Sequence, residues 1–102
     1  MSQNLYKLFT DDPVEATMKN LKTQVFIRLI TILRKTNKTQ AELAKHLGIT
    51  QPRISNLFHG KLELFALEML IEFTVRMGYE IDTRFDAGNV NKPMVISLNK
   101  SK

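Results

Sequence analysis

The side chains in this sequence best suited to chemistry are hydrogen-bonding groups gathered in one short stretch. Residues 51–59 hold the polar side chains of Gln51, Arg53, Ser55, Asn56 and His59. The apolar residues between them are Ile54, Leu57 and Phe58. At helical spacing the apolar residues share one face, and the polar residues lie largely on the others. The stretch therefore predicts a short helix that presents amide, guanidinium and imidazole groups to another molecule.

A capping motif precedes this stretch and predicts another short helix. Thr39 and Glu42 have the spacing of a capping box, in which each side chain accepts a hydrogen bond from the backbone of the other. The helix then begins at Gln40. Its apolar residues at helical spacing are Leu43, Ala44 and Leu47. Gly48 supplies the positive φ with which the helix ends and the chain turns sharply.

The second helix has its own start and stop signals. Thr50 is a good N-cap, and Pro52 is tolerated in the first turn because the amides there are unpaired in any helix. Gly60 closes the helix. Ala44 lies four residues before Gly48 and Ile54 lies six after it. A small residue, a glycine and a branched aliphatic residue in this register are typical of a helix-turn-helix unit, which reads DNA.

Composition argues against catalysis. The 102 residues include no cysteine, so disulfides, thiolate catalysis and thiolate metal sites are excluded. His46 and His59 lack the spacing of metal ligands one helical turn apart, and no nucleophile–base pair or glycine-rich phosphate loop occurs. We therefore expect a protein that is not an enzyme and that needs no cofactor and no metal. Hydrophobic residues make up 43% of the chain, enough for one small domain with a single core.

Positive charge is concentrated in the middle of the chain. The net charge is +5, and residues 21–64 hold eight Lys and Arg residues against Glu42 and Glu63. The charge therefore coincides with the helix-turn-helix unit, as phosphate binding requires. Without the motif, a solvated basic face would be the simpler explanation.

No stretch has the length of a membrane span or the pattern of a signal peptide, so we expect a cytoplasmic protein with no membrane partner.

Three further helical segments surround the motif. The first begins at the Asp-Pro pair of residues 12–13 and reaches about residue 20. Residues 21–35 carry a wide apolar stripe, which is typical of a central core helix. The apolar pattern of residues 65–77 predicts a helix on the other side of the core, closed by Gly78.

After Gly78 the pattern changes to strict alternation, which predicts a half-buried strand. The residues on its apolar face are Tyr79, Ile81, Thr83 and Phe85. Residues 94–98 can form a second strand. One or two strands are marginal alone and expose an edge, so the simplest partner is the same strand of a second subunit across a twofold axis. The alternative is a monomeric hairpin folded against the helices.

From Leu21 to Phe85 the chain resembles the phage-repressor-like helix-turn-helix regulators, or XRE family, and within them the HigA-type antitoxins. The residues 39–60 carry most of the resemblance. Residues 47–57, Gly60-Lys61 followed by Phe65, and the ending Gly78-Tyr-Glu-Ile look especially like the antitoxin branch. Ala66 departs from the family, since a capping serine would be more typical at the start of the fourth helix.

The resemblance implies a mainly α, lambda-repressor-like domain of five helices with one or two short C-terminal strands, in which the third helix enters the major groove. Carried over by position, Gln51, Arg53 and Asn56 face base edges, and Pro52 can touch a thymine methyl. Gln and Asn can pair bidentately with adenine, and Arg with guanine. The residues expected at phosphates are Thr39, Gln40, Thr50, Ser55, His59 and Lys61. For each polar residue, plain solvent exposure is the alternative.

These features predict a dimeric repressor of double-stranded DNA that reads an inverted-repeat operator. A narrower hypothesis is an autoregulating antitoxin of a type II module, whose partner is a small ribonuclease toxin. The alternatives are a stand-alone regulator without a toxin and a protein-interaction adaptor that has lost DNA binding.

The expected division is an N-terminal arm and short helix in 1–20, the DNA-binding domain in 21–78 and a dimerising C-terminal element in 79–102. The arm carries a net charge of −1 and an apolar cluster formed by Leu5, Tyr6, Leu8 and Phe9. This cluster either docks on the protein's own core or holds a basic toxin.

Overall fold

The computed structural model describes residues 12–85, 88 and 94–100, and this part of the chain is mainly helical. Its α-helices are α1 (Pro13–Lys35), α2 (Gln40–Leu47), α3 (Gln51–Phe58) and α4 (Leu67–Arg76). A short 3-10 helix, η2 (Leu62–Leu64), links α3 to α4, and two strands follow, β1 (Tyr79–Phe85) and β2 (Met94–Lys100). The predicted class, helices followed by short C-terminal strands, is confirmed.

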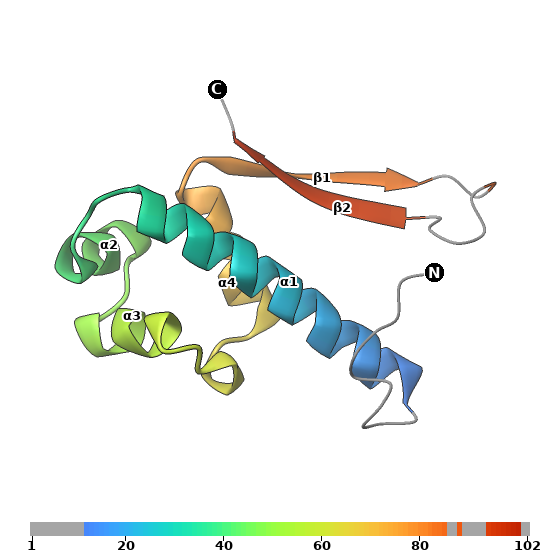
Figure 1. Cartoon of the computed structure of the whole chain (residues 1–102), viewed down its shortest axis with the longest axis horizontal. Helices are drawn as coiled ribbons and strands as arrows, with labels where there is room; N and C mark the ends of the chain where they lie inside the picture. Colours follow the sequence, from blue (N-terminus) through green and yellow to red (C-terminus); the bar gives the residue numbers. More distant parts are fainter. Residues whose placement is uncertain (1–11, 86–87, 89–93, 101–102) are drawn as a thin grey trace.

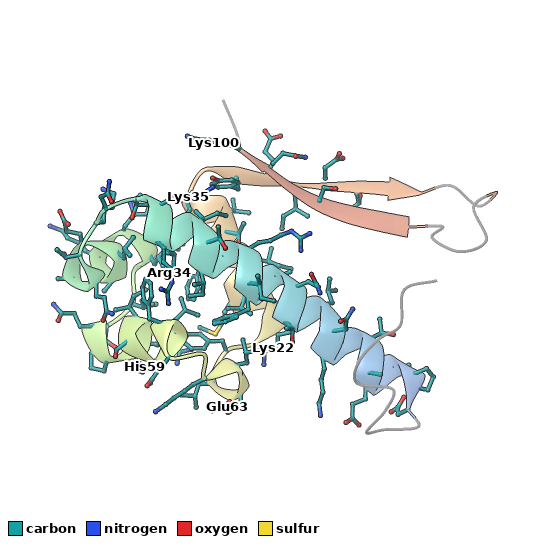
Figure 2. The ribbon with its side chains drawn as sticks, viewed as in Figure 1. Lys22, Arg34, Lys35, His59, Glu63 and Lys100 are labelled. Carbon is teal, nitrogen blue, oxygen red and sulfur yellow. The ribbon has the colours of Figure 1, made fainter. Side chains whose placement is uncertain are left out.

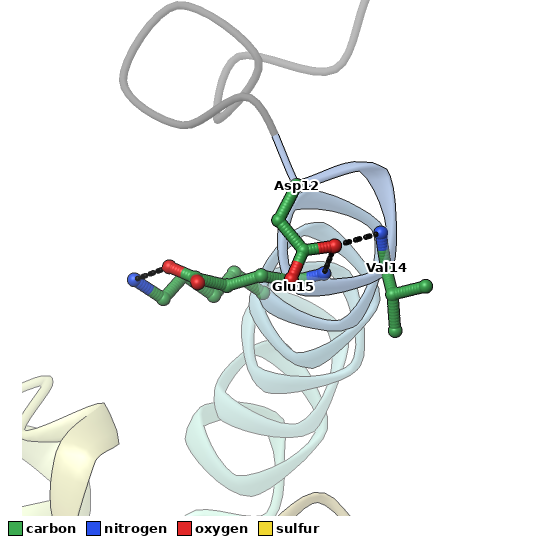
Figure 3. Close-up of polar contacts among 4 residues, drawn as sticks. Asp12, Val14 and Glu15 are labelled. Carbon is green, nitrogen blue, oxygen red and sulfur yellow. Dashed lines mark hydrogen bonds and ion pairs between the residues drawn. The ribbon is translucent and has the colours of Figure 1, made fainter.

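Helix α1 begins as predicted but is much longer. The carboxylate of Asp12 accepts hydrogen bonds from the amides of Val14 (2.9 Å) and Glu15 (3.3 Å), which caps the helix (Figure 3). The expected break near residue 20 is wrong: α1 runs unbroken from Pro13 to Lys35, and no glycine or proline interrupts it after its first position. A Glu15–Lys19 ion pair of 3.1 Å spans one of its early turns. The described residues therefore contain four α-helices, where the resemblance implied five.

The core lies where α1 meets the other helices. Its largest fully buried side chains are Phe65, Phe73, Leu29, Leu33, Leu43, Leu47, Ile54, Leu57 and Leu70. Phe65 and Phe73 meet edge to face, with ring centroids 6.3 Å apart. Ala44 is buried in the last turn of α2, and Ile49, in the turn that follows, packs against the core. The small side chain of Ala44 lets the two short helices approach closely.

Helix α4 is fixed mainly by packing. Its N-cap is Ala66, which makes no side-chain hydrogen bond, in keeping with the missing capping serine. The buried hydroxyl of Thr74 donates to the carbonyl of Leu70 (2.8 Å), so it leaves no unpaired polar atom. At the other end, Nε2 of His46 on α2 donates to the carbonyl of Arg76 (2.9 Å). This bond ties α2 to the last turn of α4.

The two strands form an antiparallel hairpin within the chain. The register runs from Tyr79 opposite Lys100 to Phe85 opposite Met94. Residues 94–98 therefore pair with β1 of their own chain, which the sequence left open. The hairpin lies on the opposite side of α1 from α3 (Figure 1). The apolar cluster of residues 5–9 lies outside the described residues, as does most of the loop between the strands.

Candidate nucleic-acid interface

The predicted capping box and turn are confirmed. The hydroxyl of Thr39 accepts from the amide of Glu42 (3.1 Å), and the carboxylate of Glu42 accepts from the amide of Thr39 (2.8 Å). The hydrogen bond from the Thr39 backbone lowers the pKa of Glu42, and the one from its side chain adds to the effect. Gly48 has a φ of 72°, and the amide of Ile49 donates to the carbonyl of Ala44 (2.9 Å). These bonds fix the angle at which α3 leaves α2.

Helix α3 has one buried face and one open face. Ile54 and Leu57 are 0% exposed, which anchors the helix to the core. Gln51 and Pro52 are exposed, and Asn56 is half-buried. At about 100° per residue, Pro52 lies opposite the buried pair, and Gln51 and Asn56 lie on either side of it. An amide, a proline ring and a second amide thus lie outside the buried face of α3.

The starts of α2 and α3 offer unequal numbers of backbone donors. The amides of Gln40 and Ala41 at the start of α2 make no hydrogen bond to another described residue. At the start of α3, Pro52 has no N–H, and the amide of Arg53 donates to the Thr50 hydroxyl (3.3 Å). An anion would therefore find more free backbone donors at α2 than at α3.

Arg53 is placed differently from the other polar residues of α3. Its side chain is half-buried, and its Nη2 donates to the carbonyl of Leu64 (3.3 Å) and lies 3.2 Å from the sulfur of Met69. The guanidinium carbon lies 4.6 Å from the centroid of the Phe65 ring. The guanidinium therefore faces the protein itself, where the sequence predicted an outward side chain.

The end of α3 brings three of the predicted phosphate residues close together. Nδ1 of His59 donates to the carbonyl of Ser55 (2.7 Å), and the Ser55 hydroxyl lies 3.4 Å from the same nitrogen. A neutral His59 ring in this geometry offers Nε2 only as an acceptor, so it must be doubly protonated to donate to a phosphate. Lys61 is exposed, and its amide donates to the carbonyl of Asn56 (3.2 Å).

The basic residues of α1 are divided between two sides of the molecule. Arg34 points toward α3, and its guanidinium lies 5.7 Å from the Phe58 ring centroid (Figure 2). Lys35 lies on the hairpin side, where it lines a cleft of about 250 Å³ with Arg28 and Tyr79. The charge of residues 21–36 is thus only partly gathered around α3. From the sequence, Arg34 was only one of the eight basic residues in 21–64. Its contact with Phe58 in the fold connects it with α3.

Two further findings concern the part of the chain that the structure describes. No group of three or more histidine, aspartate or glutamate side chains there could hold a metal ion. None of its helices combines the length and the apolar character that a membrane span requires.

Comparison with known proteins identifies the family. Residues 8–85 match the model of the helix-turn-helix domain family, a range that includes all four α-helices and β1. No curated protein matches the sequence. The match covers well over half of the chain, and the geometry of α2, the turn and α3 agrees with it. The chain belongs to the helix-turn-helix domain family of DNA-binding regulators.

Proposed function

We propose that this protein is a sequence-specific transcriptional repressor that inserts α3 into the major groove of double-stranded DNA. The observation that carries the proposal is the open side of α3, where Pro52 lies between Gln51 and Asn56 around the helix, while Ile54 and Leu57 are fully buried on the other side. Gln51 and Asn56 can each pair bidentately with the N6 and N7 edge of adenine, and Pro52 can contact a thymine methyl.

Phosphate contacts on both sides of α3 would fix its register in the groove. The hydroxyls of Thr39 and Thr50 accept hydrogen bonds from their helices. The Thr50 hydroxyl can still donate its own O–H to a phosphate, whereas the Thr39 hydroxyl also bonds to the Glu42 carboxylate. The free amides of Gln40 and Ala41 add backbone donors. Lys61 supplies a positive charge just beyond the other end of α3, the end at which Ser55 and His59 lie.

A second copy of the chain is the proposed partner in DNA binding. The described sheet has two strands of seven residues, and such a hairpin is marginal in water and leaves its edges unpaired. We propose that two protomers join through the β1 residues Tyr79, Ile81, Thr83 and Phe85. The twofold axis would place two α3 helices about one DNA turn, roughly 34 Å, apart, so that they read an inverted repeat.

The narrower proposal is an autoregulating antitoxin of a type II module. It rests on the resemblance of residues 47–57 and 78–81 to HigA-type antitoxins. Its partner would be a small ribonuclease toxin, held by the acidic and apolar residues 1–20. Finding a small basic ribonuclease in the adjacent reading frame would support this proposal, and finding none there would favour a stand-alone regulator. An adaptor that has lost DNA binding is the remaining alternative.

DNA binding itself is tested by fluorescence anisotropy on duplexes that the wild-type protein enriches from a randomised pool. We expect affinity for the enriched duplex to exceed that for random duplex by about 10³-fold or more, and to fall steeply as salt rises. Gln51→Ala should weaken binding by about 1–3 kcal/mol. If the protein binds neither duplex at low salt, the repressor proposal is wrong and the adaptor alternative is favoured.

The matched control is Gln24→Ala on α1. Gln24 is exposed, and its side chain accepts a hydrogen bond from Arg28, which lines the cleft on the hairpin side. This substitution removes the same amide from a surface away from α3, so we expect it to leave DNA affinity unchanged.

A further inference from the structure

The side chain of Arg53 occupies the joint between α3 and α4. Its guanidinium bonds to the carbonyl of Leu64, touches the sulfur of Met69 and stacks on Phe65. Leu64 ends η2, Phe65 follows it in the link, and Met69 lies in the first turn of α4. One side chain of α3 therefore contacts the end of η2, the link that follows it and the first turn of α4.

The aromatic ring beneath the guanidinium is buried. Phe65 is 1% exposed and packs edge to face on Phe73, which is 2% exposed. A cation over an aromatic ring gains strength as it loses water, and a hydrogen bond from a charged donor is stronger than a neutral one. To reach a base edge, Arg53 would have to give up both its stacking on Phe65 and its hydrogen bond to Leu64. These contacts favour a role inside the protein.

The same contacts determine where Lys61 lies. Residues 61–64 are bonded to α3 at both ends, because the amide of Lys61 donates to the carbonyl of Asn56 (3.2 Å) and Arg53 donates to the carbonyl of Leu64 (3.3 Å). Within the segment, the amide of Leu64 donates to the carbonyl of Lys61 (3.1 Å). Arg53 thus holds the far end of a short loop whose near end is the exposed Lys61, which is bonded through its amide to the end of α3.

We propose that Arg53 is a positioning residue for DNA recognition. It fixes α3 against residues 61–69 and thereby sets the distance between the base-contacting face and the phosphate contact at Lys61. The inference rests on the proposed function. It assigns Arg53 a positioning role in place of the guanine contact that was predicted from the sequence.

The test compares Arg53→Met and Arg53→Lys with Gln51→Ala. Each is measured by anisotropy on the duplex that the wild type enriches and on a complete set of its single base-pair substitutions. We expect Arg53→Met to bind every duplex about 3- to 30-fold more weakly, with an unchanged order of base preference. Arg53→Lys keeps a cation near Phe65 but lacks the forked donor, so its loss should be smaller. Gln51→Ala should lose preference at one position in each half-site.

Two results would overturn the inference. A loss confined to one base pair in the Arg53 variants would show that Arg53 reads a base. Unchanged affinity in variants that keep the wild-type circular dichroism would show that the contacts only support the fold. Should Arg53→Met unfold at the assay temperature, Arg53→Lys is judged by the same two criteria. A wild-type protein that enriches no sequence contradicts the proposed function as well, which separates that failure from one seen in the variants alone.

Discussion

Gly48→Ala is expected to destabilise the protein by about 1 kcal/mol. Gly48 has a φ of 72°, in the left-handed region, where an L-residue costs roughly 1–2 kcal/mol. A Cβ at this position would lie 3.6 Å from Nη1 of Arg76, an ordinary van der Waals distance, so no clash adds to the cost. Alanine also restricts the unfolded chain, which offsets about 0.4–1 kcal/mol. The net loss should lower the Tm by about 4–8 °C.

Thermal unfolding followed by far-UV circular dichroism measures this loss, with two matched variants beside it. Gly60 has nearly the same φ, 73°, and a Cβ there would meet nothing within 4 Å, so Gly60→Ala should lower the Tm equally. Gly48→Asn should lower it less, because asparagine adopts left-handed backbone more readily. A Tm that Gly48→Ala leaves unchanged, or lowers far more than Gly60→Ala does, would refute the reasoning.

Three further predictions follow from the capping box, the hairpin and the N-terminal arm. The lowered pKa of Glu42 means that its capping contribution is present above the ordinary value of 4.5 and is lost as pH falls through the lowered value. Glu42→Gln keeps an acceptor that does not titrate, so its Tm should fall less than that of the wild type in an acid titration; equal falls would contradict this role. Truncation after Gly78 should give a monomer with much weaker DNA binding, and a truncated protein that still sediments as a dimer would place the interface elsewhere. If a ribonuclease toxin is the partner, deletion of residues 1–11 should abolish its capture in a pull-down without changing the DNA shift, whereas full capture would show that another surface holds it.

The local signals of the motif could be predicted from the sequence because they act between close neighbours. The Thr39–Glu42 capping box, the Thr50 cap and the turn at Gly48 each depend on residues within a few positions of one another. The alternation after Gly78 predicted β1 for the same reason. The predicted break near residue 20 failed because it rested on a weak change in amphipathicity, with no helix-breaking residue to enforce it.

The placement of Arg53 could not be predicted, because it depends on partners 11 to 16 residues away. The sequence shows that Arg53 borders the buried face of α3, since it precedes Ile54 and lies four residues before Leu57. It does not show that Phe65 and Leu64 pack against that border. Likewise, only the position of the hairpin reveals that Arg28 and Lys35 lie away from α3.

The central claim, that α3 reads bases through Gln51, is tested most directly by an atom-level substitution in the DNA. In the enriched duplex, each adenine is replaced in turn by 7-deazaadenine, which lacks the N7 acceptor of a bidentate contact. The account predicts an adenine in each half-site at which the replacement weakens binding of the wild type but not of Gln51→Ala. An equal loss in both proteins at every adenine, or no loss at any, would contradict it.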